Sequence, residues 1–590
     1  MKKATFLKLL SAVLCLVTLV SMLPACNNGG DGNVTTDDIT TEAPETEAPE
    51  PDPLNIITNG TVNYEIIYPT VTDLPESNAV TTLRRYFKTY TGLEIRMSND
   101  SKTEDTVTNK IIIGRAKYDE VQKLFGELKY HDYKVVISGS NIIIAAYTKE
   151  GYDKALNYVT NNILTHATGS GAERSLTVKV NGFSGTDKAD YKVKSWTIAG
   201  NALGNYKIIY GNKDYYDSLV SFRDTIAEQT GYYLDVLQDT KADPSPYEIL
   251  IGDTNREESK AVNAPTYLAY NATVKNSKLV IKSGGAYSTQ KLLSSLYTTL
   301  VKGKTEIEMG SDFVLEGNYL TDTLDSSKPA DSNLRIMSCN ILAEFPSWTT
   351  DTTVHPYLPV VLRKEILFSA IDYYQPTIIG FQEFTMAWYE AMDDYRDADK
   401  WELIKFKNAQ RTDGEYVFST VMFRKDLYTL VESGTKHYSK HNNARCRLYT
   451  WVVLKDNATG KEFTFASTHW DGAGREHGFL QVGEFVKFIN EMKKRGPVFT
   501  TGDFNSNEIS AEYEQFLKDA DILDAKLNTL KKVNDIGSWH NFCKSDFSWG
   551  SCDHITATKD TTVQKYQTIT GNETIYGSDH CWIIADIKFN

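Results

Sequence analysis

Asp503 and Asn505 stand two residues apart at the end of the apolar stretch 498–505, Val-Phe-Thr-Thr-Gly-Asp-Phe-Asn. The apolar and β-branched residues predict a buried strand, which we expect Gly502 to end. Residues two apart in an extended chain project to the same side, so a carboxylate and a carboxamide would lie together at the strand end. Such a pair can hold a cation or orient a water molecule, but the same string can also form a plain turn that closes a strand.

Further stretches between residues 332 and 590 begin or end in the same way. Each is apolar and strand-like, and each carries at one end a residue capable of ligand or acid–base chemistry. These residues are Asn340, Glu383, His469, Asp553, Asp579 and His580. Any one of them could be a loop or capping residue. Together they predict a site assembled at one rim of a sheet, because loops on a rigid scaffold often carry function.

The residue types favour one reaction class. Asparagine, glutamate and aspartate oxygens are hard ligands, which suit Mg²⁺ or Mn²⁺ with waters completing the coordination shell. Two histidines beside carboxylates supply proton transfer and phosphate contacts near neutral pH. Metal-assisted hydrolysis of a phosphoester is the reaction that uses every member of this set.

The cysteines do not add a second kind of metal site. Five of the seven lie in the last third of the chain: Cys339, Cys446, Cys543, Cys552 and Cys581. Their odd number and their spacing fit neither a zinc site nor a disulfide-rich scaffold. We expect Cys339 and Cys581 to be small core residues. The sequence allows a disulfide bond between Cys543 and Cys552 but gives no support for one.

The Gly-Asp-Phe-Asn and Ser-Asp-His elements carry a family resemblance. On these motifs and their order, residues 332–590 resemble the endonuclease/exonuclease/phosphatase superfamily, which includes pancreatic-type deoxyribonuclease, neutral sphingomyelinases and inositol polyphosphate phosphatases. The resemblance implies a four-layer α/β sandwich, in which two mostly antiparallel sheets pack face to face with helices outside.

The resemblance also implies which residues bind the metal and activate water. Asn340 and Glu383 would be metal ligands, and Asp579 would touch the metal directly or through water. Asp503 would orient or deprotonate the attacking water. Asn505 would stabilise the pentavalent phosphorane. Because all five match the family pattern, the implied activity is a magnesium-dependent hydrolase acting on phosphoester bonds, of phosphodiesterase type.

The remaining implied roles fall on the histidines and one arginine. His469 would contact the scissile phosphate, and Asp553 would pair with His580 and fix its tautomer. Arg447 matches an arginine that many members place near the substrate, although a surface salt bridge explains it equally well.

The N-terminal residues indicate export. Residues 1–25 have a Lys-containing start and a short apolar run, which is typical of a signal peptide. The segment ends Leu-Pro-Ala-Cys and resembles the bacterial lipobox, which implies a lipid on Cys26 and an extracytoplasmic protein anchored to a bacterial membrane or cell surface. An ordinary signal peptide is the other interpretation. Residues 26–53 are rich in Thr, Glu, Asp and Pro and predict a disordered acidic linker.

Two stretches in the middle of the chain look like copies of each other. Residues 54–185 and 192–320 repeat the motifs Asn-Tyr-x-Ile-Ile-Tyr and Ile-x-Ile-Gly about 140 residues apart. Each copy predicts an α+β domain of strand, helix, two strands, hairpin and helix. The order resembles, weakly, the non-catalytic domains that precede the barrel in several glycoside hydrolases. Their tyrosines are either core residues or carbohydrate contacts.

Composition and net charge favour one class of substrate over another. The chain has 590 residues and a formal net charge of −14, with no domain-wide basic surface for nucleic acid. We therefore expect a monomeric phosphoesterase whose substrate is a phospholipid head group or a phosphorylated sugar or glycan. A surface nuclease that degrades external DNA or RNA is the alternative. A glycan-binding lipoprotein with an inactive sandwich domain is a second one.

Overall fold

The structure is a computed structural model of the whole chain. It describes residues 51–181, 183–263, 267–320, 325–344, 359–405, 416–440, 447–471, 475–541, 547, 550–571 and 574–589. Residues 1–50, and with them the predicted signal peptide, Cys26 and most of the predicted linker, lie outside the described residues. Cys446 and Cys543 lie outside them as well.

The first α+β region contains a six-stranded sheet in the order β4-β3-β5-β7-β6-β9. Strands β3, β4, β5 and β7 run parallel, and β6 and β9 complete the sheet through antiparallel pairs. Leu83 and Phe87 of helix α1 pack against Ile111 and Ile142 of the sheet. The elements are β3 (Glu65–Tyr68), α1 (Leu74–Thr91), β4 (Arg96–Asn99), β5 (Lys110–Ile113), α2 (Asp119–Glu127), β6 (Tyr133–Ser138), β7 (Asn141–Ala146), α3 (Lys149–Asn162) and β9 (Ser184–Asp187).

The second α+β region has a sheet of the same topology, in the order β13-β12-β14-β16-β15-β18. The pattern of parallel and antiparallel pairs is also the same. The small sheets beside the two differ, because β1 (Leu54–Thr58) pairs antiparallel with β8 (Leu176–Val178) whereas β10 (Ser195–Ile198) pairs parallel with β17 (Glu306–Met309). The main elements are β12 (Lys207–Tyr210), α4 (Tyr216–Thr230), β13 (Val236–Gln238), β14 (Glu248–Ile251), β15 (Ala269–Lys275), β16 (Lys278–Ser283), α6 (Ala286–Leu296) and β18 (Val314–Asn318).

The C-terminal domain is built on two sheets. The seven-stranded sheet has the order β21-β22-β20-β19-β31-β30-β28, and the six-stranded sheet has the order β23-β24-β25-β26-β29-β27. Most neighbouring strands are antiparallel, and the parallel pairs are β19 with β20, β25 with β26 and β28 with β30. The strands of the first sheet are β19 (Leu334–Asn340), β20 (Ile378–Thr385), β21 (Trp401–Leu403), β22 (Val417–Arg424), β28 (Lys531–Val533), β30 (Thr562–Thr568) and β31 (Ile583–Lys588). Those of the second are β23 (Tyr428–His437), β24 (Leu448–Asp456), β25 (Glu462–His469), β26 (Val498–Asp503), β27 (Ile522–Asp524) and β29 (Asp553–Thr558).

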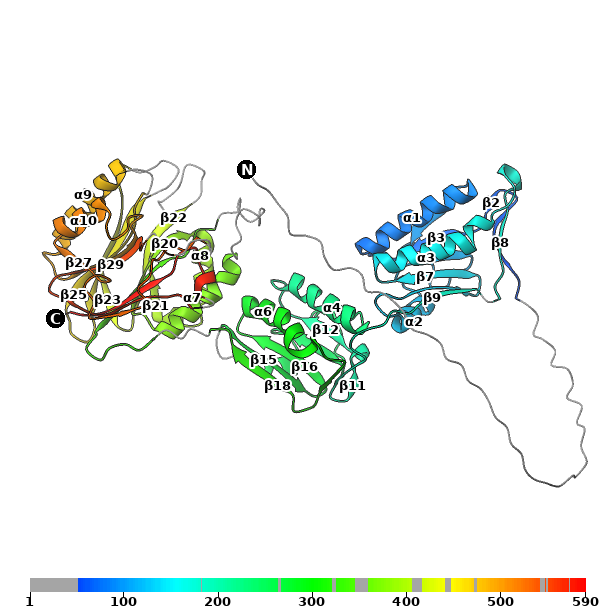
Figure 1. Cartoon of the computed structure of the whole chain (residues 1–590), viewed down its shortest axis with the longest axis horizontal. Coiled ribbons are helices and arrows are strands. Elements are labelled where there is room, and N and C mark those ends of the chain that lie inside the picture. Colours follow the sequence, from blue (N-terminus) through cyan, green and yellow to red (C-terminus); the bar gives the residue numbers. More distant parts are fainter. Residues whose placement is uncertain are drawn as a thin grey trace, which may run out of the picture. The chain divides into compact units, whose positions relative to one another are not determined.

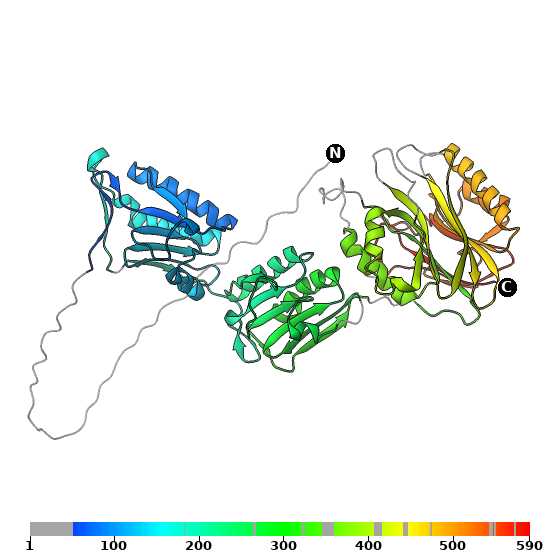
Figure 2. The same ribbon diagram turned by 180° about the vertical axis from the view of Figure 1, so that it is seen from behind.

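The two sheets pack face to face, with helices on their outer faces (Figures 1 and 2). Ile336 and Phe423 of the first sheet meet Phe465, Phe499 and Ile555 of the second in one buried cluster. Helices α7 (Val360–Tyr374) and α8 (Met386–Met392) lie against the first sheet, and α9 (Arg475–Met492) and α10 (Ala511–Asp519) lie against the second. The four-layer sandwich predicted from the sequence is confirmed for this domain.

Helix α7 has buried residues all around it, including Arg363 and Glu365. One local expectation needs correction. Gly502 does not end its strand, because β26 continues to Asp503. A Cβ at Gly502 would lie 2.7 Å from the carbonyl oxygen of Thr468 on the neighbouring strand, so the glycine permits close approach of two strands.

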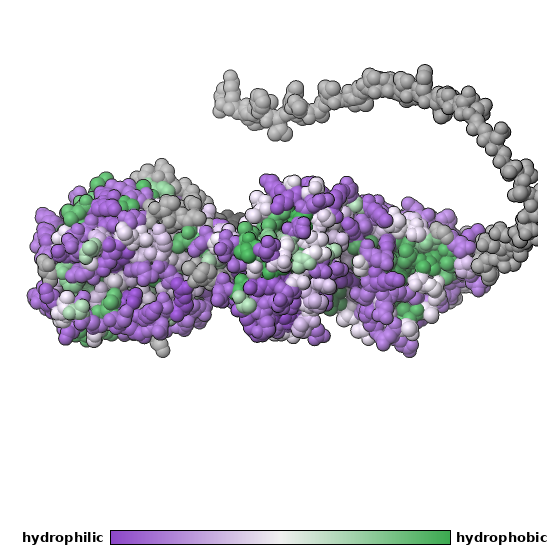
Figure 3. All heavy atoms as spheres, turned by 90° about the horizontal axis from the view of Figure 1, so that it is seen from below, coloured by the Kyte–Doolittle hydropathy of each residue, from purple (hydrophilic) through white to green (hydrophobic). Residues whose placement is uncertain are grey.

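The face drawn in Figure 3 is covered largely by hydrophilic residues, with smaller separate hydrophobic patches. Within the part of the chain that the structure describes, no helix is both long enough and apolar enough to cross a membrane.

Candidate active site

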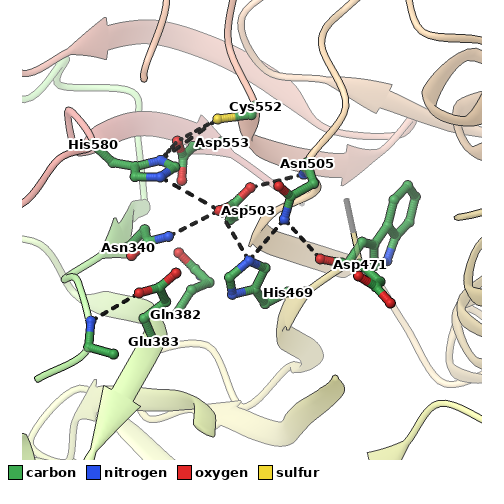
Figure 4. A network of polar contacts seen from close by, with 12 residues as sticks. Asn340, Gln382, Glu383, His469, Asp471, Asp503, Asn505, Cys552, Asp553 and His580 are labelled. Carbon is green, nitrogen blue, oxygen red and sulfur yellow. Dashed lines mark hydrogen bonds and ion pairs between the residues drawn. The ribbon is translucent and has the colours of Figure 1, made fainter. Parts of the chain in front are cut away.

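Strand ends from both sheets meet at one rim of the sandwich, and the side chains predicted to do chemistry converge there (Figure 4). Strands β19, β25 and β26 end at Asn340, His469 and Asp503. Strand β29 begins at Asp553, and His580 shortly precedes β31. The pairing register places His469 directly beside Asp503, and Asp503 directly beside Asp553.

Asp503 lies at the centre of the group. Its Oδ2 accepts a hydrogen bond from Nδ2 of Asn340 at 3.0 Å, and lies 3.2 Å from Nε2 of His469 and 3.8 Å from Nε2 of His580. Burial raises the pKa of Asp503, but the two histidines outweigh it and hold the pKa far below its usual value. The carboxylate is therefore ionised, and hydrogen-bond donors surround it on several sides.

Asn505 reaches the same point by a turn rather than by strand alternation. The strand ends at Asp503, and Asn505 has a φ of 46°, in the left-handed region that residues other than glycine seldom adopt. Its backbone N–H donates to Oδ1 of Asp503 at 2.9 Å, and its Nδ2 lies 3.0 Å from Nε2 of His469. The pair does lie together, but the extended-chain reason given from the sequence was wrong.

His580 is held by a carboxylate and a thiol. Its Nδ1 lies 2.8 Å from Oδ2 of Asp553 and 3.7 Å from Sγ of Cys552. Burial disfavours the imidazolium, but the Asp553 carboxylate outweighs it and raises the pKa of His580 well above its usual range. Burial also raises the pKa of the Cys552 thiol, which is free and donates to Asp553 at 3.5 Å. These three side chains could ligate a metal by proximity, but their atoms are already engaged in hydrogen bonds with one another.

The pKa of His469 is shifted in the opposite direction, to lower values. Burial, and then the positive charge of Arg447, lower the pKa of His469, although Asp503 opposes them. Arg447 is itself buried, at 4% exposure, so it is no surface salt bridge. The site thus keeps a cationic imidazole at His580 and a neutral one at His469. Two titratable groups whose environments push their pKa values apart are suited to different tasks.

Glu383 lies where β20 is irregular. The register of β20 against β22 shifts between Phe381 and Phe384, and Glu383 has a φ of 58°. Its Oε2 accepts a hydrogen bond from the backbone of Ala343, 3.0 Å away. Backbone strain of this kind persists where the surrounding structure enforces it, and is found often at functional sites. The irregularity points the carboxylate of Glu383 toward Asn340 and Asp503 (Figure 4).

Residues 337–580 match the profile of the Endonuclease/Exonuclease/phosphatase family. The C-terminal domain belongs to this family. The enzymes of the family are nucleases and phosphatases, which hydrolyse phosphoester bonds, and they generally depend on divalent metal ions. A comparison with curated proteins found no match.

The matching solved structures each cover less than half of this chain. An endonuclease/exonuclease/phosphatase from Bacteroides vulgatus is 23% identical, with a TM-score of 0.38, and covers 44% of this chain and 99% of that one. A mannosyl-6-phosphatase from Bacteroides thetaiotaomicron is 20% identical, with a TM-score of 0.38 and coverage of 44% and 100%. The human nocturnin catalytic domain is 18% identical, with a TM-score of 0.35 and coverage of 45% and 97%. None of these similarities assigns a substrate.

The family's metal requirement fits the donor set of this chain. Asn340, Glu383 and Asp579 offer hard oxygen atoms, and the last two are only partly buried at the rim. Burial raises the pKa of Asp579 to about 6, His580 opposes this shift, and the charges of Glu383 and Asp503 add to it. Several carboxylates gathered in one place repel one another, and a bound cation would relieve this repulsion. The predicted ligands therefore suit a hard divalent ion.

The family domain also uses residues that the sequence reasoning missed. Trp582 Nε1 donates to the carbonyl oxygen of Asn340 at 3.1 Å, and Trp388 Nε1 donates to that of Leu342 at 3.2 Å. The fully buried Arg363 donates to the same Leu342 oxygen at 3.0 Å. These donors fix the segment that follows β19 and so orient Asn340. They come from three distant parts of the chain, so no local pattern could have revealed them.

Proposed function

We propose that the protein is a magnesium-dependent phosphoesterase of phosphodiesterase type whose attacking water is handled by Asp503. The observation that carries this proposal is the position of Asp503, an ionised carboxylate set between Nε2 of His469 and Nε2 of His580. A carboxylate between two imidazoles can orient a water molecule while Nε2–H of the cationic His580 faces an oxygen of a phosphate.

The steps assigned to the chain follow from the hydrogen bonds. Asp503 orients the water and accepts its proton as the new P–O bond forms and the ester P–O bond breaks. Asn505, whose carboxamide lies beside His469, donates to the negative charge that develops on phosphorus oxygens. Asp553 holds the proton on Nδ1 of His580, which leaves Nε2 of that ring to face the phosphate. His469 contacts the same phosphate from the opposite side.

Asn340, Glu383 and Asp579 are the residues proposed to hold the ion. A bound Mg²⁺ or Mn²⁺ would polarise the phosphoryl oxygens and lower the pKa of a water molecule. The backbone N–H of Leu342 already occupies one lone-pair direction of Asn340 Oδ1 at 3.1 Å, and that of Ala343 occupies one of Glu383, so these oxygens are fixed in place before an ion arrives.

The location and the natural substrate belong to the proposal as well. The segment 1–25 and Cys26 support a lipid-anchored protein outside the cytoplasm, with residues 26–53 as a spacer. A phospholipid head group or a phosphorylated sugar or glycan suits that place, and the two α+β regions would bind carbohydrate or act as spacers. The net charge of −14 disfavours tight binding to polyanions, which makes a nuclease the second candidate.

A substrate panel tests the proposal. The purified protein is incubated with sphingomyelin vesicles, inositol phosphates, a mannose 6-phosphate glycan, plasmid DNA, RNA and bis(p-nitrophenyl) phosphate, each with Mg²⁺ or with EDTA. We expect hydrolysis of at least one compound in Mg²⁺ and none in EDTA. Cleavage of DNA or RNA alone would favour the nuclease, and hydrolysis that persists in EDTA would overturn the proposed metal dependence. A chain inert on all of them would favour the glycan-binding alternative.

A further inference from the structure

A second aspartate–histidine pair lies buried behind the catalytic rim. His554 follows Asp553 directly in β29, so its side chain projects to the opposite face of the sheet, toward helix α10. Its Nδ1 lies 3.1 Å from Oδ2 of Asp524, and its Nε2 lies 2.9 Å from the carbonyl oxygen of Ser506. Both His554 and Asp524 are 1% exposed. Each ring nitrogen therefore faces an oxygen atom.

Neither of these oxygens can donate a proton. The Ser506 oxygen is a carbonyl. Burial raises the pKa of Asp524, but hydrogen bonds from His554, Tyr513 and the Leu527 N–H outweigh it and lower the pKa, which keeps Asp524 ionised. A ring that meets acceptors at both nitrogens must donate from both. His554 is thus an imidazolium, with Glu508 as a further carboxylate nearby, and these contacts raise its pKa against the effect of burial.

Aromatic contacts also fix the orientation of the His554 ring. Tyr513 of α10 stacks on it, with ring centroids 3.9 Å apart and planes inclined by 24°. Phe504 meets it edge to face at 5.6 Å. A cation over an aromatic face is attracted by the ring quadrupole, and stacking leaves the imidazolium one orientation. The position of Nε2 is therefore determined by the core beneath it.

The hydrogen bond from Nε2 of His554 fixes the loop that carries Asn505. Ser506 comes directly after Asn505, whose left-handed backbone directs its carboxamide to His469. The same loop is tied a second time through Glu508, which accepts from the backbone of Ser551 at 3.1 Å and from Lys526 at 2.7 Å. Both ties anchor the loop to the segment that enters β29. The bond from His554 is the one next to the active site.

We propose that His554 is a positioning residue for the proposed phosphoesterase reaction, because its buried imidazolium bridges Asp524 to the Ser506 carbonyl and sets the backbone of Asn505. The proposal rests on the proposed function of Asn505. It adds a requirement that the catalytic residues alone do not contain. The hydrogen bond to Ser506 governs the rate, whereas the bond to Asp524 governs the orientation of the ring.

Two variants separate these bonds. In His554→Gln the amide nitrogen can reach the place of Nε2 and keep a donor to Ser506, and in His554→Asn it can reach only the place of Nδ1. We expect kcat for bis(p-nitrophenyl) phosphate to fall about tenfold or more in His554→Asn and less than about threefold in His554→Gln, with KM unchanged in both. The control His166→Asn makes the same exchange at an exposed histidine of the first α+β region, which lies outside the proposed site, so its kcat should stay near that of the wild type.

All rates are measured per folded molecule, with the folded fraction determined by circular dichroism. A purely structural role for His554 predicts a lower melting temperature with an unchanged kcat in both variants, and that result overturns the proposal. Equal losses of kcat in the Gln and Asn variants overturn it too, because the retained Ser506 donor would then have no effect.

A spectroscopic readout needs no activity. The protein contains ten histidines, and ¹⁵N-histidine labelling with a His554→Gln difference spectrum identifies the signals of this ring. We expect both ring nitrogens of His554 to be protonated at pH 7. A single protonated nitrogen would contradict the bridge between Asp524 and Ser506. If the bridge is found but no phosphoester is hydrolysed, the proposed function fails while the geometry stands, so the two failures are distinguishable.

Discussion

Nδ1 of His580 lies 2.8 Å from Oδ2 of Asp553, and the pair is almost completely buried. A carboxylate on Nδ1 fixes the tautomer of a histidine, because Nδ1 must carry the proton that the hydrogen bond requires. It also stabilises the positive charge of the ring. The protonation and orientation of Nε2 of His580 at the rim therefore depend on Asp553, which binds the other nitrogen of the ring.

Replacing Asp553 by Asn tests this dependence. The carboxamide can present its N–H₂ group to Nδ1, which favours the wrong tautomer and removes the charge that raises the pKa of His580. We expect kcat to fall by about 10² to 10⁴, with a small change in KM. Steady-state kinetics with bis(p-nitrophenyl) phosphate give both constants. A kcat close to that of the wild type would show that the orientation of His580 does not matter for the reaction.

Asn505→Ala tests the assignment of the carboxamide as a donor to the developing charge. Removing one such donor should lower kcat by about 10² to 10³, while substrate binding changes little. Ser506→Ala is a matched control one residue away, because its backbone carbonyl, and with it the bond from His554, is retained. Equal kinetics for Asn505→Ala and Ser506→Ala would exclude the proposed role of Asn505.

Glu383→Gln tests the proposed metal ligand. The variant can keep the hydrogen bond from the Ala343 N–H but loses the negative charge that a hard cation prefers. We expect the Mg²⁺ concentration for half-maximal activity to rise about tenfold or more, with activity partly recovered at saturating Mg²⁺. Titration of the EDTA-treated protein with Mg²⁺ measures this shift. An unchanged titration curve would remove Glu383 from the ligand set.

Glu365 of α7 predicts a pH dependence of stability. It accepts hydrogen bonds from the backbone of Tyr287 at 2.9 Å and Ser288 at 3.3 Å, and burial raises its pKa to about 7 from the ordinary value of 4.5. The folded state therefore binds the proton of Glu365 more tightly than the unfolded state does. The resulting contribution to the free energy of unfolding is fully present below about pH 4.5 and is lost as the pH rises through 7. The loss amounts to about 3 kcal/mol.

The measurement for Glu365 is a difference between variants. The free energies of unfolding of the wild type and Glu365→Gln, from urea titrations, should diverge by that amount between pH 4 and pH 8, with the wild type losing ground. Glu390→Gln, at an exposed position on α8, is the control and should show no such trend. A constant difference for Glu365→Gln would mean that Glu365 ionises normally.

The sequence predicted the rim of the site well because the site follows strand ends. Asn340, His469 and Asp503 each stand where an apolar run stops and Asp553 where one begins, and the parallel and antiparallel pairs bring those ends together. A run of apolar residues is enough to predict a buried strand. The four-layer arrangement followed from the family resemblance, since strand order depends on contacts far apart in the sequence.

The parts that could not be predicted depend on long-range contacts. The left-handed turns at Glu383 and Asn505 carry no glycine that would mark them. Arg447 looked as much like a surface residue as a buried one, and only its 4% exposure decides the matter. The bridge from His554 to Ser506 spans 48 residues and two sides of a sheet, so spacing gave no sign of it.

The most direct test of the account is the hydrolysis rate of Asp503→Asn in Mg²⁺, measured beside the wild type in Mg²⁺ and in EDTA. Asparagine keeps the shape of the side chain but cannot accept a proton from water. The account predicts that both the substitution and the chelator lower the rate of bis(p-nitrophenyl) phosphate hydrolysis by about 10³ or more, in a protein that remains folded by circular dichroism. A folded Asp503→Asn variant that hydrolyses this phosphodiester at the wild-type rate would contradict it.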